Sequence, residues 1–391
     1  IFLPPKSHNK PDDGYPVVVY IHGGNFKEGG NDTPLYKFRN MALLDVVVVV
    51  IQYRLGIFGF LYIDDGSDIR GNYGYMDQIE ALKWVNININ AFDGNNQQIT
   101  IAGESAGACS TSLFLVDKQT FSLYNQVILE SISCSSIPLR EPNENKVLGQ
   151  CVMKYLNCPS STCIRTITNT TLLLQAQLTC ANKFKADMKH FLEIFEPFEP
   201  TIKTNDTTIN DQILALIEKG QYHPNVNVLI GSDKDETTGF VYGTFPNSVS
   251  QLEAEILLTT IYGIRHVKEI TKLYPLHINK TDTREVMISM QNDFMFKCPT
   301  RNISNMIAKN GYNQVYIYEF AHIPPQNETK IIWGQADSYC WDKCCHATEI
   351  PFLWNTINEI VNSSTIAEQK LSSTMNHYLT NFIKTGNPNA N

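Results

Sequence analysis

Uninterrupted hydrophobic runs predict strands that are buried on both faces. Residues 16–24, PVVVYIHGG, and 45–56, DVVVVVIQYRLG, are rich in β-branched side chains and end in glycine or turn residues. A strand with apolar side chains at nearly every position must be covered on both faces, as in a parallel sheet. We expect further strands in four more segments: 97–103, 124–131, 226–236 and 313–322.

Helical periodicity follows some of these strands. Apolar side chains recur at helical spacing over residues 76–92, which predicts a helix. A second helix is predicted over residues 106–116, directly after the third strand. The order strand, helix, strand, helix predicts an α/β fold with a mostly parallel sheet. The segments at about 140–220 and 245–310 are predicted to be helical insertions. No repeat, low-complexity linker or domain boundary is visible, so residues 1–391 are expected to form a single domain.

Composition and charge exclude some classes of partner. The chain has 391 residues, of which 43% are hydrophobic and 18% charged, which is enough apolar material for a large core. The formal net charge of −8 offers no basic patch for nucleic acid or an anionic membrane. The longest apolar run, MALLDVVVVVI, is far shorter than the ~20 residues that a membrane-spanning helix needs. We therefore expect neither a nucleic-acid partner nor a membrane span.

Cysteines and glycosylation sequons together indicate the secretory route. The chain contains ten cysteines, and disulfides and N-glycans both form in that compartment. A chain rich in Asn and Thr also produces sequons by chance, which is the alternative interpretation. We expect a secreted or lumenal glycoprotein. The candidate acceptors are Asn31, Asn169, Asn205, Asn279, Asn302, Asn327 and Asn362.

The segment GESAG, residues 103–107, presents a candidate nucleophile. The pattern G-x-S-x-G occurs by chance in roughly one chain in ten of this length, so its context decides. Here a predicted strand precedes Ser105 and a predicted helix follows it, which is the turn that exposes a catalytic serine. The N–H group of Ala106 at the start of that helix can stabilise an oxyanion. The alternative is a tight turn packed on a strand end.

A catalytic serine needs a base and an acid that orients the base. In α/β-hydrolases these follow the serine in the order Asp or Glu, then His, on loops after strands. Asp233, Asp235 and Glu236 follow one predicted strand, and His346 lies further downstream. Spacing alone does not distinguish among the three carboxylates, and a solvated acidic loop is the alternative for each.

The HGGN segment directly after the first strand is a candidate oxyanion hole. Backbone N–H groups of Gly23, Gly24 and Asn25, which follow His22, can face the same point as Ser105. The alternative is a flexible strand end.

With these segments in place, the sequence resembles the carboxylesterase type B, or cholinesterase-like, family of α/β-hydrolases. The resemblance implies an α/β-hydrolase fold and a catalytic triad. The segments that carry it are VVVYIHGGNFKEGG, VVVVVIQYRLGIFGFL, GNYGYMDQIEALKWVNININAFDGNNQQITIAGESAGA, VNVLIGSDKDETTGF, NDFMFKCPT, CCHATEIPFLW and NFIKTGNPN. The implied triad is Ser105, Glu236 and His346. The implied oxyanion donors are Gly24, Asn25 and Ala106, with Gly23 beside them, and the pocket residues are Phe26, Glu104 and Phe240.

The chain departs from the family pattern at several positions. Asn25 stands where the family usually has glycine or alanine, although Asn tolerates left-handed backbone. Thr237 stands where glycine commonly follows the acid. In the acyl-pocket segment, Ile194 and Glu196 occupy the positions of an expected aromatic pair, which favours a general carboxylesterase over a choline esterase. The usual regions before IFLPP and after TGNPNAN are expected to be missing.

The resemblance also implies how some cysteines pair. Cys158 and Cys163 correspond to a small disulfide-closed loop, and Cys298 lacks its usual C-terminal partner. The spacing of Cys340, Cys344 and Cys345 could suggest zinc, but His346 is the one further ligand nearby, so we expect no metal and no other cofactor.

The sequence thus predicts a serine carboxylesterase that hydrolyses a small-molecule ester, and it allows for a homodimer. One alternative is a catalytically weak or inactive relative with a binding, adhesion or storage role, since fold does not fix function. A choline esterase is the second alternative.

Overall fold

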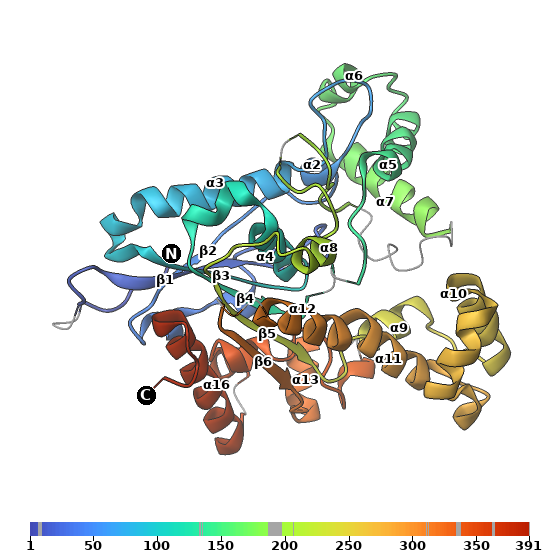
Figure 1. Ribbon diagram of the computed structural model, residues 1–391. Helices are drawn as coiled ribbons and strands as arrows, with labels where there is room; N and C mark the ends of the chain where they lie inside the picture. Colours follow the sequence, from blue (N-terminus) through green and yellow to red (C-terminus); the bar gives the residue numbers. More distant parts are fainter. Residues whose placement is uncertain are drawn as a thin grey trace.

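A parallel sheet forms the centre of the molecule (Figure 1). The computed structural model describes residues 1–6, 10–132, 134, 136–186, 198–205, 207–309, 311, 313–333, 338–361 and 364–390. Within them the six strands run in the order β2-β1-β3-β4-β5-β6, and every neighbouring pair is parallel. The strands are β1 (Tyr15–Ile21), β2 (Val47–Val50), β3 (Gly94–Glu104), β4 (Gln126–Glu130), β5 (Asn227–Asp233) and β6 (Val315–Phe320). Each lies within or overlaps one of the predicted segments, which confirms the α/β fold class.

Helices occupy most of the connections between these strands. The first nine are α1 (Arg39–Ala42), α2 (Gly56–Phe60), α3 (Tyr73–Asn88), α4 (Ala106–Val116), α5 (Pro142–Tyr155), α6 (Ser161–Arg165), α7 (Thr170–Ala186), α8 (Ile213–Glu218) and α9 (Thr238–Thr244). They are followed by α10 (Gln251–Leu273), α11 (Arg284–Asn292), α12 (Cys298–Lys309), α13 (Gln326–Trp333), α14 (Ile350–Leu353), α15 (Ile357–Ile360) and α16 (Ile366–Thr385).

Strand alternation divides the core into two layers. Successive side chains of β1 point to opposite faces, so Val17 and Val19 belong to the cluster that includes α3 and α4, whereas Val18 and Tyr20 pack with α14 and α16. All seven residues of β1 are buried. Figure 1 shows α3 and α4 on one side of the sheet and α16 on the other. The continuous hydrophobic runs therefore reflect a sheet that is covered on both faces.

The helices of the two predicted insertions lie only partly away from this sheet. Helices α5, α6 and α7 gather at one end of the molecule, and α10 and α11 gather at another with a small core of their own (Figure 1). Both segments nevertheless reach the main core, to which α5 contributes Leu148, α8 contributes Ile213 and α12 contributes Ile303. The bounds 140–220 and 245–310 of the two insertions stay predictions.

Disulfides join several of these elements. The pairs are Cys109–Cys134, Cys151–Cys180, Cys158–Cys163 and Cys340–Cys345, of which the third is the pair that the family resemblance implies. Cys298 is free and exposed, and Cys344 is free and buried. In the described ranges, no helix has the length and apolar character required to cross a bilayer.

Candidate active site

Ser105 lies in a strained turn between strand and helix. β3 ends at Glu104 and α4 begins at Ala106, so Ser105 alone connects them. Its backbone has φ of 57° and ψ of −122°, which a non-glycine residue rarely adopts. The Ser105 N–H donates to the Glu130 carbonyl at 3.0 Å, which anchors the turn to β4. This is the geometry that presents a nucleophilic serine above the sheet edge.

The glycines that flank Ser105 allow strand and helix to approach closely. A Cβ atom on Gly107 would lie 2.0 Å from the Ile21 carbonyl oxygen, and one on Gly103 would lie 2.4 Å from the backbone of Gly107. Real Cβ atoms do not tolerate such distances, so both positions require glycine for steric reasons.

The glycine loop, defined as residues 22–25 directly after β1, lies against Ser105. A Cβ atom on Gly23 would be 3.0 Å from the Ser105 Cβ atom. Gly24 and Asn25 both have positive φ, at 108° and 53°, and Asn accepts this conformation better than most residues do. Ala106 is the first residue of α4, so its N–H has no acceptor within the helix. Gly23 and Ala106 therefore adjoin Ser105, and Gly24 and Asn25 follow Gly23 in the same loop.

His22 has a supporting position in this loop. Its ring is fully buried, stacks on Tyr53 with 4.5 Å between the ring centroids, and its Nδ1 lies 2.8 Å from the Gly23 carbonyl. Tyr53 in turn donates its hydroxyl to the His22 carbonyl. Through these contacts His22 holds the glycine loop in place.

Glu236 and His346 meet although 110 positions separate them. The Nδ1 atom of His346 donates to Glu236 Oε2 at 2.5 Å. The other carboxylate oxygen of Glu236 accepts the N–H of Asp233 at 2.8 Å, and the Glu236 side chain is fully buried. Glu236 is therefore held on both oxygens, and it fixes the imidazole tautomer that leaves Nε2 free to accept a proton.

The Nε2 atom of His346 faces Glu104. It lies 3.1 Å from Glu104 Oε1, and within the described ranges no hydrogen bond joins His346 to Ser105. Catalytic hydrogen bonds are often long or misaligned before substrate binds.

The charges around His346 alter its protonation. Burial alone lowers the pKa of His346, but the negative charges of Glu104, Glu236 and Glu349 outweigh burial and raise the pKa to about 9. Burial raises the pKa of Glu104 to about 8, partly opposed by the charge of His346. The two protonation equilibria are linked, because an ionised Glu104 stabilises the imidazolium.

Two further buried carboxyls belong to the same region and were missed by sequence reasoning. Glu130 lies at the end of β4, where Trp354 Nε1 donates to both of its oxygens at 3.2 Å, and Glu349 follows His346 by three residues. Both are fully buried, and burial raises the pKa of each. A glutamate inside the apolar runs QVILE and EIPFLW is the signal that could have identified them.

The predicted pocket residues have different surroundings. The rings of Phe240 and Phe296 each lie 5.3 Å from the His346 ring, so Phe240 does flank the site. The ring of Phe26 is fully buried in the main core against Phe60, and its place in the substrate pocket stays a prediction. The acyl-pocket positions Ile194 and Glu196 lie outside the described residues.

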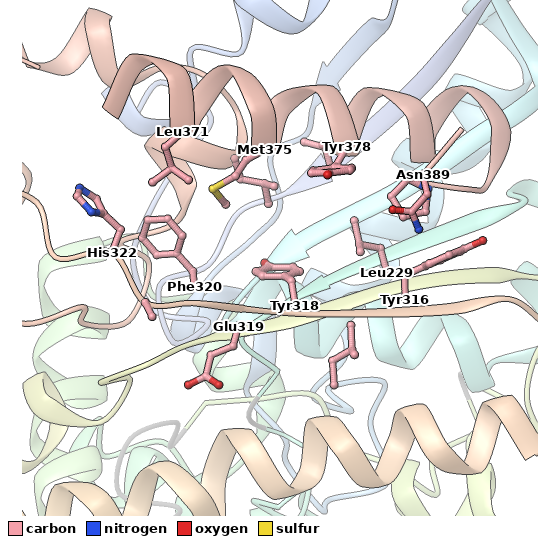
Figure 2. A pocket seen from close by; sticks show the side chains of 15 residues that line it. Leu229, Tyr316, Tyr318, Glu319, Phe320, His322, Leu371, Met375, Tyr378 and Asn389 are labelled. Carbon is pink, nitrogen blue, oxygen red and sulfur yellow. The ribbon is translucent and has the colours of Figure 1, made fainter. Parts of the chain in front are cut away.

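A separate cavity of about 420 Å³ lies between β6 and α16, away from the serine. Figure 2 shows Leu371, Met375 and Tyr378 of the helix facing Tyr316 and Tyr318 of the strand. None of the three expected triad residues lines it. Its lining is mostly apolar, with His322 at one end, where Nε2 contacts Glu368 Oε1 at 2.9 Å.

The cysteines before His346 form a disulfide. Cys340 pairs with Cys345, and the Cys344 thiol donates to the Phe320 carbonyl at 3.3 Å. Across the described ranges, no group of three or more His, Cys, Asp or Glu side chains is arranged to hold a metal ion.

The sequons lie on the surface where they are described. Six asparagines are exposed, and the seventh, Asn362, lies outside the described residues. The six are Asn31, Asn169, Asn205, Asn279, Asn302 and Asn327.

Comparisons with known proteins agree on one family. A family model described as "Carboxylesterase family" matches residues 1–391. The cAMP-regulated D2 protein of Dictyostelium discoideum is 32% identical over 386 residues, which cover 97% of this chain and 68% of that protein. Para-nitrobenzyl esterase of Bacillus subtilis (strain 168) is 29% identical, with 97% of this chain and 72% of the esterase covered. A solved PNB esterase structure matches with a TM-score of 0.78 at 27% identity, over 99% of this chain and 75% of that one.

Proposed function

The chain belongs to the carboxylesterase family, and from this membership we propose that it is a serine carboxylesterase with Ser105, Glu236 and His346 as its triad. The family and its esterase members support ester hydrolysis in general. The observation that carries the specific proposal is the 2.5 Å contact between Glu236 and His346, beside a serine held in a strained turn.

In the proposed reaction, His346 Nε2 removes the hydroxyl proton of Ser105 as the oxygen attacks the ester carbonyl. Glu236 holds the imidazole at Nδ1 and stabilises the imidazolium that forms. The N–H groups of Gly24, Asn25 and Ala106 stabilise the tetrahedral oxyanion, and loss of one such donor typically costs ~3 kcal/mol. The imidazolium then protonates the leaving alcohol, and water hydrolyses the acyl-enzyme by the same steps.

Two variants test this proposal. Ser105→Ala is expected to abolish hydrolysis of a short-chain nitrophenyl ester, and His346→Gln is expected to reduce kcat by several orders of magnitude. His322→Gln is the matched control, because His322 also contacts a glutamate, Glu368, but lies away from the serine. Full activity of Ser105→Ala would refute the assignment of the nucleophile.

A binding, adhesion or storage protein is the second candidate function. The position of His346 Nε2 against Glu104 favours it, because an imidazolium held by a carboxylate is not a general base. A fluorophosphonate probe separates the two candidates. Labelling of Ser105 would support the esterase, and a folded protein that remains unlabelled at pH 8 to 9 would support the binding role.

Choline selectivity is a narrower version of the esterase proposal. Choline selectivity is tested by comparing kcat/KM for a nitrophenyl ester with kcat/KM for the thiocholine ester of the same acid. We expect the nitrophenyl ester to be preferred.

We also propose that the protein is a glycoprotein of the secretory pathway. Four disulfides and six exposed sequons support this. Endoglycosidase treatment of protein purified from its source should increase its electrophoretic mobility. An unchanged mobility would contradict the proposal.

A further inference from the structure

We propose that Asp233 and Asp235 are positioning residues, which hold the loop that carries His346 on both sides of the imidazole. The inference rests on the proposed function and deepens it. The acid loop is defined as residues 233–236, and the base loop as residues 344–348. The three carboxylates of the acid loop are equivalent by spacing, but each contacts a different part of the base loop.

Asp235 binds the base loop two residues before His346. The Cys344 N–H donates to Asp235 Oδ2 at 3.1 Å, and the Asp235 N–H donates to the Cys344 carbonyl at 2.9 Å. Both polar backbone groups of Cys344 are thus bound by a single residue, which neighbours Glu236 in the chain. This two-bond ring fixes the distance between the acid and the start of the base loop.

Asp233 binds the base loop two residues after His346. The Thr348 N–H donates to Asp233 Oδ2 at 2.9 Å, and the Asp233 side chain is fully buried. The N–H of the same aspartate donates to Glu236 Oε1 at 2.8 Å. Asp233 therefore holds both the catalytic acid and the far side of the base loop.

These bonds matter because the base loop has no regular secondary structure of its own. Residues 344–348 lie outside any helix or strand, and Ala347 has a positive φ of 68°. The contact between Glu236 and His346 lies between the two aspartate contacts. Removal of either flanking bond would let the imidazole shift, and a displacement of about 1 Å of a catalytic group can cost ~100-fold in rate.

The test for Asp235 uses one disruptive and one conservative variant. Asp235→Ala removes the acceptor for the Cys344 N–H, and we expect kcat for a nitrophenyl ester to fall ~10- to 100-fold with KM nearly unchanged. Asp235→Asn keeps an oxygen that can accept this bond, and we expect kcat within about threefold of the wild-type value. If the charge of Asp235 were required instead, Asp235→Asn would lose as much activity as Asp235→Ala.

A matched control separates positioning from stability. Asp65 also holds two loops, because its carboxylate accepts the N–H groups of Ser67 at 3.0 Å and Ser161 at 2.8 Å. Asp65→Ala should lower Tm about as much as Asp235→Ala does, while kcat stays at the wild-type value. If Asp235→Ala does not fold, Asp235→Ser replaces it, since the shorter hydroxyl is not expected to reach Cys344.

Variants of Asp233 test the same inference independently of Asp235. Asp233→Asn keeps an acceptor for Thr348 and should retain kcat within about threefold, whereas Asp233→Ala should lose ~10- to 100-fold. Wild-type kcat in both alanine variants would overturn the inference, and so would an equal loss in the alanine and asparagine variants. The proposed function fails separately, because it is refuted by activity of Ser105→Ala and not by these results.

Discussion

Replacement of Glu104 by glutamine should move the pH dependence of ester hydrolysis toward acid by one to two pH units. In the proposed mechanism the general base is the neutral imidazole of His346, so kcat/KM rises as pH increases through the apparent pKa of this residue. In the wild-type protein this pKa is raised to about 9, and among the carboxylates that raise it Glu104 has the largest effect. Glutamine has a similar shape and no charge, so it stabilises the imidazolium less.

The contact distance limits the size of this effect. Unit charges 3.1 Å apart interact by ~5 kcal/mol at an effective dielectric constant of about 20, which corresponds to a limit of ~4 pH units. The elevation of the His346 pKa is smaller, from an ordinary value of 6.5 to about 9, and Glu236 and Glu349 share in it. The pKa of Glu104 is itself raised to about 8, so its charge is incomplete near neutral pH. One to two pH units is therefore the expected change.

The assay is the kcat/KM profile for a short-chain nitrophenyl ester from pH 5 to 10, with a fluorophosphonate labelling rate as a second readout. Glu328→Gln is the matched control, because Glu328 is also a buried glutamate with a raised pKa, but its charged neighbour is Glu368. The control should leave the profile unchanged. An apparent pKa that is the same in Glu104→Gln and in the wild-type protein would show that Glu104 does not hold the proton on His346.

Three further predictions concern stability. Burial raises the pKa of Glu130, so the folded protein binds this proton more tightly than the unfolded chain, and the free energy of unfolding should fall as pH rises above about 4.5. Glu130→Gln should weaken this fall in urea titrations at pH 5 and pH 8, and an identical slope in both proteins would contradict it. Gly107→Ala should lower stability by at least ~1–3 kcal/mol, because its Cβ would lie 2.0 Å from a carbonyl oxygen of β1. Gly243→Ala, which meets nothing within 4 Å, should leave Tm unchanged or raise it. Replacement of Cys109 and Cys134 by serine opens a loop of about 26 residues and should cost ~3.5 kcal/mol by the chain-entropy model, as measured by thermal unfolding.

The strands were predictable because burial on both faces requires a continuous run of apolar residues, which is visible in the sequence. A strand covered on both faces needs an apolar residue at nearly every position, and β1 and β2 meet this need with runs of valine. The helical segments were harder to divide. Ile213 and Ile303 lie within stretches of mixed polarity, and no local pattern distinguishes a helix that joins the main core from one that joins the separate small core of α10 and α11.

At the candidate site, the serine turn and the order of the proposed catalytic groups could be inferred from the residues, but only the family resemblance selected Glu236 from its neighbours. Asp233, Asp235 and Glu236 lie within four positions, and only the directions of their side chains assign one to the imidazole and two to backbone groups. The resemblance could not indicate the surroundings of Phe26, whose ring is buried in the core against Phe60.

The unpaired Cys344 has a consequence for how the protein survives heating. It adjoins Cys345, so its thiol is next to a disulfide that thiolate attack could rearrange. Burial raises the pKa of Cys344 to about 12, and the thiolate is the attacking species, so the folded state suppresses this exchange at neutral pH. Unfolding restores an ordinary pKa of about 8.5 and frees the thiol. Recovery of activity after a heat pulse should therefore be greater at pH 5 than at pH 8, because disulfide shuffling competes with refolding only at the higher pH.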